Sequence, residues 1–289
     1  MLQAEFEKAV DAIVNGDAAT LKELLHHHPA LITARSDRDH HAMLLHYTAA
    51  NGVEDYRQLT PPNIVEITRI LLDAGAEVDA VGEMYGGSTT LGLAATSCHP
   101  ADAGVQEALV DLLMDYGADP AIAVSPGYDG DLITACLANG RGKAAIWLAK
   151  KGVPTNLEGT AGIGDLDALK SWLHEDGSLK DETLREKLNA GFNWACEFGH
   201  LDVVRFLVEN GFDLSTLTNG MTGLHWAAIG GQAEMVRFLL EKGAPLEIEN
   251  CYGGTVLGQA LWSAKNEPLQ QHDEIIRILR AAGAKETGI

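Results

Sequence analysis

The sequence is poor in aromatic residues and in basic residues. Aromatic residues make up 6% of the 289 residues, which is little for one bulky core and favours a fold packed from Ala and Leu. Lys and Arg number 21 against 41 Asp and Glu, which gives a formal net charge of -20 at pH 7. A surface of this charge repels phosphate, so we expect no binding to nucleic acid and none to anionic membranes.

The sequence also lacks paired cysteines and long apolar runs. Its four cysteines stand far apart, at Cys98, Cys136, Cys196 and Cys251, and form no CxxC pair. It therefore predicts neither a zinc site nor a disulfide framework. No apolar run approaches the roughly 18 residues that a membrane-spanning helix needs, and residues 1–10 carry two Glu, unlike a signal peptide. We expect a cytoplasmic protein without metal or cofactor.

What the sequence does contain is a repeated unit. The segment Thr222–Gly231 is followed by apolar residues at helical spacing and then by Gly243, and the segment Met43–Gly52 is followed by a similar stripe and Gly75. Looser copies bring the number of units to eight, with starts near residues 7, 43, 89, 131, 155, 190, 222 and 255. A unit this small cannot bury its own apolar face, so it must stack on a neighbour and form a solenoid.

Each unit indicates two short helices. The first is rich in small residues, and the second has an apolar stripe of period 3.6, as at Val236, Leu239 and Leu240. A glycine follows most second helices, where a left-handed residue commonly ends a helix. These glycines are Gly75, Gly117, Gly152, Gly177, Gly211, Gly243 and Gly283.

The motif residues resemble those of a known repeat family. The segment Thr222–Ala228, TGLHWAA, resembles the TPLHxAA motif of ankyrin repeats, with Gly223 in place of proline. The resemblance covers nearly the whole chain and implies one all-α ankyrin-type solenoid over residues 1–289, with short hairpin fingers between repeats. It also implies that His46 and His225, the surviving motif histidines, bond to backbone between units. Because every copy lacks the proline, we expect irregular helix starts.

The fingers carry the candidate binding residues. Three fingers place a Tyr beside glycines, and the resemblance implies that fingers line the concave groove in which partners bind. Tyr offers an amphipathic anchor of low conformational cost, but the same ring could instead lie flat and pack on the next finger. The predicted partner-binding residues are His40, His41, Met84, Tyr85, Tyr128, Asp129 and Tyr252.

Two insertions interrupt adjacent units. Residues 53–62 lie between the helices of the second unit, and residues 98–104 lie at the matching place of the third. Because the units are neighbours, we expect these loops to lie side by side. Long loops in a compact array are often functional, although tolerated surface insertions would look the same. They supply a secondary loop site of Tyr56, Arg57 and His99.

The favoured function is a non-catalytic protein–protein interaction module that uses the concave groove of an acidic array. Its charge indicates a protein partner with a basic patch. The alternative is an enzyme or small-molecule binder on the fingers of the second to fourth units, since His, Tyr and carboxylate together could do acid/base chemistry. The residues concerned are His40, His41, Glu83, Tyr85, Tyr128 and Asp129. A deep, partly apolar pocket there would favour the alternative.

Overall fold

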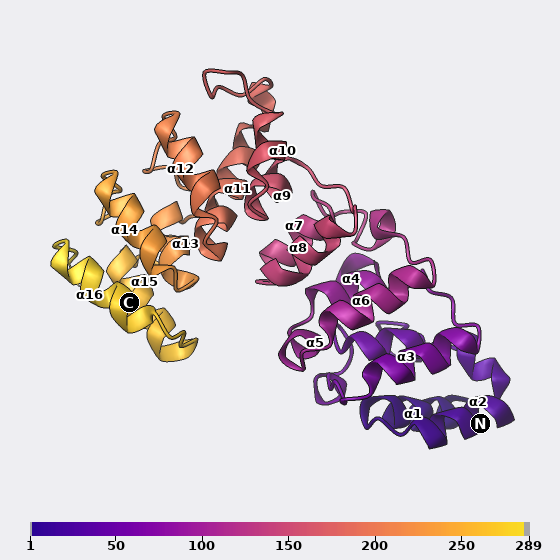
Figure 1. Ribbon diagram of the computed structural model, residues 1–289. Helices are drawn as coiled ribbons and strands as arrows, with labels where there is room; N and C mark the ends of the chain where they lie inside the picture. The colour runs from indigo at the N-terminus through magenta and orange to yellow at the C-terminus, as the bar shows by residue number, and fades with distance from the viewer. Residues whose placement is uncertain (1, 286–289) are drawn as a thin grey trace. The chain divides into compact units, whose positions relative to one another are not determined.

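A computed structural model describes residues 2–285, and the regular structure in them is almost entirely helical (Figure 1). They divide into two compact units, unit 1 up to Pro154 and unit 2 from Thr155 onward. Within the described residues, the only strands are β1 (Val81–Gly82) and β2 (Ser88–Thr89), which form one antiparallel hairpin. The predicted all-α fold with short hairpin fingers is confirmed, while a single continuous array stays a prediction.

Unit 1 holds four helix pairs, stacked in successive layers in Figure 1. The α-helices are α1 (Leu2–Val14), α2 (Ala18–His27), α3 (Ile64–Asp73), α4 (Thr90–Thr96), α5 (Cys98–Asp102), α6 (Gln106–Asp115), α7 (Leu132–Ala138) and α8 (Gly142–Lys150). The 3₁₀ helices are η1 (Pro29–Thr33), η2 (Leu44–Ala49), η3 (Asp55–Arg57), η4 (Met84–Gly86) and η5 (Pro120–Ile122). Of these, η2 is the first helix of the second pair, and the others are parts of connecting segments.

The helices of unit 1 differ in burial as the sequence predicts. The small-residue helix α4 is buried along most of its length and packs against η2, α6 and α7. The second helix α3 buries only one side, which includes Ile64, Ile67 and Leu71. Burial of such stripes between neighbouring repeats is the main stabilising contribution in a stack of this kind.

The first helix of the second repeat departs from α geometry. Residues 44–49 form the 3₁₀ helix η2, which ends at Ala50 in the left-handed region with φ 48°. The Thr48 hydroxyl donates to the carbonyl of Leu45 at 2.8 Å, three residues back, which suits a 3₁₀ turn. The irregular helix start that the missing proline predicts is therefore present here.

Unit 2 also holds four helix pairs, and its longest helix packs against its neighbours on both sides. That helix, α11, contacts α9, α12 and α13. The helices are α9 (Leu157–Gly162), α10 (Leu166–Lys170), η6 (Glu182–Leu184), α11 (Arg185–Phe198), α12 (Leu201–Glu209), α13 (Gly223–Ile229), α14 (Ala233–Glu241), α15 (Val256–Asn266) and α16 (His272–Ala281). None of the helices in residues 2–285 is long and apolar enough to cross a bilayer.

The prediction that a glycine follows the second helices is confirmed with one exception. All seven glycines have positive φ, and six of them directly follow a second helix. The exception is Gly177, which lies in the turn between Leu173 and Leu179, well past the end of α10 at Lys170. The second helix of this repeat is only five residues long, so Gly177 shapes a turn. A side chain there would also collide with Asn210.

Candidate functional site

Three consecutive fingers of unit 1 are joined by hydrogen bonds. The backbone N–H of Glu83 donates to the carbonyl of His40 at 2.9 Å, and the Ser125 hydroxyl donates to the carbonyl of Gly86 at 3.0 Å. Arg35 adds side-chain bonds of 2.9 Å to the carbonyls of His41 and Val81. The fingers are thus fixed relative to one another, as a preformed binding surface requires.

A cavity of about 400 Å³ lies beside these fingers. Its walls come from two fingers, from the first helices α4 and α7, and from both insertions. Its lining is partly apolar, with Leu93 and Val124 among the apolar members. The polar lining residues include Asn51, Gln58, Tyr85, His99, Tyr128 and Arg141.

Tyr85 stands at the rim of this cavity in a strained backbone conformation. Its φ of 50° places a bulky residue in the left-handed region, which costs free energy and is often found at functional sites. Its hydroxyl donates to Oδ1 of Asn51 at 2.9 Å, yet its side chain is 67% exposed. The ring is held in a defined place without being buried.

Tyr128 comes from the following finger and lines the same cavity. It is 38% exposed, and its ring lies against Gly130, where a Cβ would meet it at 2.5 Å. The neighbouring Asp129 is exposed but does not line the cavity. Two finger tyrosines from successive repeats therefore border one cavity.

The two insertions meet at this cavity, as their adjacent positions predict. Residues 53–62 contribute Gln58, and the α5 insertion contributes Cys98 and His99. Buried Gln106 fixes the start of α5, because its side-chain amide lies 3.0 Å from three carbonyls, including that of Ser97. The cavity thus brings together His99 from the predicted secondary loop site and Tyr85 and Tyr128 from the finger site.

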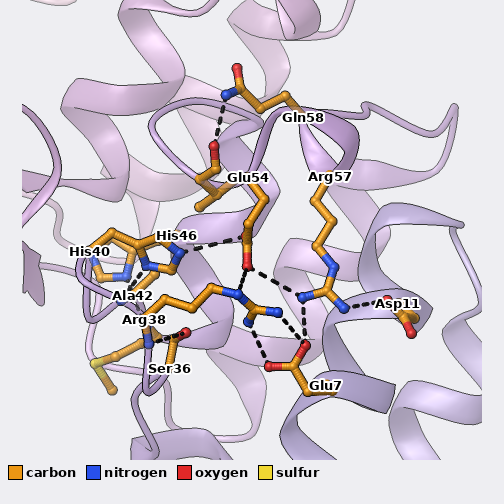
Figure 2. Close-up of polar contacts among 12 residues, drawn as sticks. Glu7, Asp11, Ser36, Arg38, His40, Ala42, His46, Glu54, Arg57 and Gln58 are labelled. Atoms are coloured by element: carbon orange, nitrogen blue, oxygen red, sulfur yellow. Dashed lines mark hydrogen bonds and ion pairs between the residues drawn. The ribbon is translucent and has the colours of Figure 1, made fainter.

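A cluster of charged side chains holds the first insertion in place (Figure 2). Arg57 is 5% exposed and contacts Glu7 and Asp11 of α1, each at 2.7 Å. Arg38 pairs with Glu7 and with Glu54, so that Glu54 lies between two guanidinium groups. The hydrogen bond from Arg38 lowers the pKa of Glu7 to about 2, against the opposing effect of burial. Arg57, predicted as a binding residue, is directed inward.

The two predicted finger histidines have different surroundings. His40 lies inside the charged cluster, 3.6 Å from Glu54 and edge-on to Tyr47, and burial lowers its pKa. His41 is about half exposed, and its Nδ1 lies 2.8 Å from Glu83. Met84, predicted as a partner contact, is only 4% exposed because it covers the backbone at Gly52 and Gly82.

The remaining predicted residues are not among those that line this cavity. Tyr56 is exposed and has the Arg57 guanidinium 5.3 Å from its ring centre. Tyr252 belongs to unit 2, where it is 78% exposed at a second cavity of about 540 Å³, beside Trp262. The predicted set is therefore divided between two units, and unit 1 holds the larger share.

One of the two motif histidines, His46, makes the bond between repeats that the resemblance implies. Nε2 of His46 lies 2.9 Å from the carbonyl of Ala80, and its Nδ1 accepts from the N–H of Met43. Burial lowers the pKa of His46 to about 4, so the ring is neutral at pH 7. In unit 2 the corresponding His225 is bonded within its own repeat, where its Nδ1 lies 2.8 Å from the Thr222 hydroxyl.

A match to a known family lies in the sequence of unit 2. Residues 157–250 and 192–287 match the protein-family model described as Ankyrin repeats (3 copies). Unit 2 is built from ankyrin repeats. Ankyrin repeats generally serve in protein–protein interaction. Unit 1 repeats the paired helices and the glycine ends of unit 2.

A solved structure described as the human ASB11 ankyrin repeat domain is similar to the chain. The two share 20% sequence identity and a TM-score of 0.47, with 96% of this chain and 99% of that chain covered. No curated protein sequence matches the chain.

Arg141 and Asn51 are cavity residues that the sequence analysis missed. Asn51 follows the motif of the second repeat and gave no signal of its own. Arg141 did give one, because residues 70–140 contain neither Lys nor Arg. Arg141 is thus the first basic residue after a long acidic and neutral stretch, and this sets it apart in the sequence.

Proposed function

We propose that this protein is a non-catalytic protein-binding module and that its partner occupies the cavity of unit 1. The observation that supports this most is that Tyr85 and Tyr128, exposed residues of two successive fingers, border one cavity. An exposed aromatic ring beside a hollow is the usual form of an interface anchor, and its burial by a partner contributes about 2 kcal/mol or more.

The rigidity of the site adds to this argument. Hydrogen bonds join the fingers, Asn51 holds the Tyr85 hydroxyl, and the charged cluster fixes the insertion that carries Gln58. A preformed surface loses little conformational entropy on binding, so more of the contact free energy is realised as affinity.

The charge of the whole chain indicates a second property of the partner, its own charge. A net charge of -20 attracts a protein with a basic patch over distances longer than a contact. Association should then slow as salt is added, because the Debye length falls to about 8 Å at physiological ionic strength. The net charge therefore affects the rate of association, whereas the cavity determines which group of the partner is recognised.

Small-molecule binding is a second candidate, favoured by the cavity volume of about 400 Å³, which lies in the range of ligand sites. The acid/base alternative from the sequence gains no such support. His40, His41, Glu83 and Asp129 are not among the residues that line the cavity.

The test compares three forms of the full chain as baits in a native lysate, with quantitative mass spectrometry of the bound proteins. We expect partners of the wild type to be lost with the Tyr85→Ala/Tyr128→Ala double variant and retained with Tyr252→Ala. Tyr252 is the matched control because it is a finger tyrosine of the other unit and is more exposed than either Tyr85 or Tyr128. Equal capture by all three forms would contradict the proposal.

A further inference from the structure

We infer that the cavity of unit 1 receives the carboxylate of an Asp or Glu side chain from a partner segment, with Arg141 as its ion-pair partner. This rests on the proposed function and specifies the chemistry that the protein-binding site recognises. The experiment below separates the two.

The charge of the cavity lining is opposite to that of the chain. The protein carries about twice as many acidic as basic residues, yet none of the described residues that line this cavity is Asp or Glu. Its charged lining residue is Arg141, and its one titratable imidazole is His99. An anion in a site whose lining holds a guanidinium and no carboxylate meets no like charge.

Arg141 is free to bind such an anion. It stands at the N-terminal end of α8, and its Nε donates to the carbonyl of Asn139 at 2.9 Å. Within residues 2–285 no carboxylate pairs with it, whereas Arg38, Arg57 and Arg237 each hold one. A guanidinium fixed through Nε still presents its terminal nitrogens, which match a carboxylate in a two-point contact.

Most of the other polar groups of the lining are already occupied. The amides of Asn51, Gln58 and Asn139 donate to carbonyls of the chain itself, at 3.1, 2.8 and 2.8 Å. The Thr96, Ser97 and Ser125 hydroxyls do the same. A ligand oxygen therefore finds its principal donors at Arg141, and this favours a compact anionic group.

The net charge of the protein and the cavity then favour different residues of one partner segment. The net charge of -20 repels a uniformly acidic peptide, so the segment that fits carries a single Asp or Glu among basic or neutral neighbours. The apolar part of the lining, with Leu93 and Val124, takes the methylenes of that side chain.

The test selects random heptapeptides displayed on phage against the full chain, against Arg141→Gln and against Arg277→Gln. Arg277 is the matched control, because its Nε also bonds to a backbone carbonyl and it lies in unit 2. We expect peptides with one invariant Asp or Glu from the wild type and from Arg277→Gln, and none of them from Arg141→Gln. Changing that residue to Asn or Gln in a selected peptide should weaken the Kd by about tenfold or more.

Chemical labelling of Cys98 shows where the peptide binds without relying on the Arg141 variant. Cys98 lines the cavity and is exposed, while Cys136 and Cys196 are buried. In a Cys251→Ser background, bound peptide should slow maleimide labelling of Cys98. Peptides that protect Cys98 but lack an acidic position, or bind Arg141→Gln equally well, would overturn this inference and leave the proposed function standing. A selection that yields no Cys98-protecting peptide would overturn both.

Discussion

The hydroxyl of Tyr85 donates to Oδ1 of Asn51 across 2.9 Å, and this bond links the finger of one repeat to the turn after the first helix of the repeat before it. Asn51 in turn donates to the carbonyl of Leu93 in the following repeat. One exposed aromatic ring is thus positioned by two successive repeats, although it takes almost no part in their cores.

Tyr85 should matter little for stability. We expect Tyr85→Ala to change the free energy of unfolding by about 0.5 kcal/mol, the range of surface sites. Tyr85→Gly should be at least as stable as Tyr85→Ala, because glycine adopts the left-handed conformation at φ 50° without strain. Thermal melts of the two variants decide this, and a loss of several kcal/mol in both would show that Tyr85 is a packing residue.

Arg57 should matter much more. Replacing it with Ala removes the guanidinium that pairs with Glu7, Asp11 and Glu54, and breaking a buried ion pair costs about 3–5 kcal/mol. Arg185→Ala is the control, since Arg185 pairs with Glu182 on the surface, where such a pair contributes about 0–1 kcal/mol. Chemical denaturation followed by circular dichroism gives both values. Equal stability of the two variants would contradict a structural role for the cluster.

The same cluster predicts loss of stability in acid. The pKa of Glu7 falls from 4.5 to about 2 on folding, so the native state binds fewer protons than the unfolded chain between these values. The stabilisation is complete above about pH 4.5 and is lost as the pH falls toward 2. Melts across this window should show a shallower acid dependence for Glu7→Gln than for the wild type. Parallel curves would contradict the assignment.

Glu197 in α11 predicts that unit 2 instead loses stability as the pH rises. Burial raises the pKa of its carboxyl to about 8. The native state then holds the proton more tightly than the unfolded chain, so stability is lost as the pH rises from about 4.5 to 8, with a slope of up to about 1.4 kcal/mol per pH unit. Glu197→Gln should remove this slope and raise the melting temperature at pH 8. A variant that melts earlier than the wild type at pH 8 would show that the carboxylate is needed.

The repeats were predictable because their signals are local. The motif at Thr222–Ala228, the apolar stripes and the glycine ends each lie within one unit, and together they identify eight helix pairs. The meeting of the two insertions also followed, since it depends only on the order of neighbouring repeats. Gly177 was misplaced because the short fifth repeat turns before its glycine is reached.

The orientation of side chains on the fingers was not predictable in the same way. His40 and Arg57 lie inside because Glu7, Arg38 and Glu54 converge on them from distant positions, and no pattern in the sequence marks that convergence. Met84 is buried because two glycines leave room for it. Such contacts depend on how the repeats stack, which a single sequence does not specify.

The contact between Arg57 and α1 has a consequence for genetics. Glu7 and Asp11 hold the insertion that supplies Gln58 to the cavity, but neither lies on its lining. A screen for mutants that fail to bind would therefore return substitutions in the first helix alongside those at Tyr85 and Arg141. These two classes would look alike in a binding assay and differ in heat sensitivity, because only the first-helix class would loosen the charged cluster.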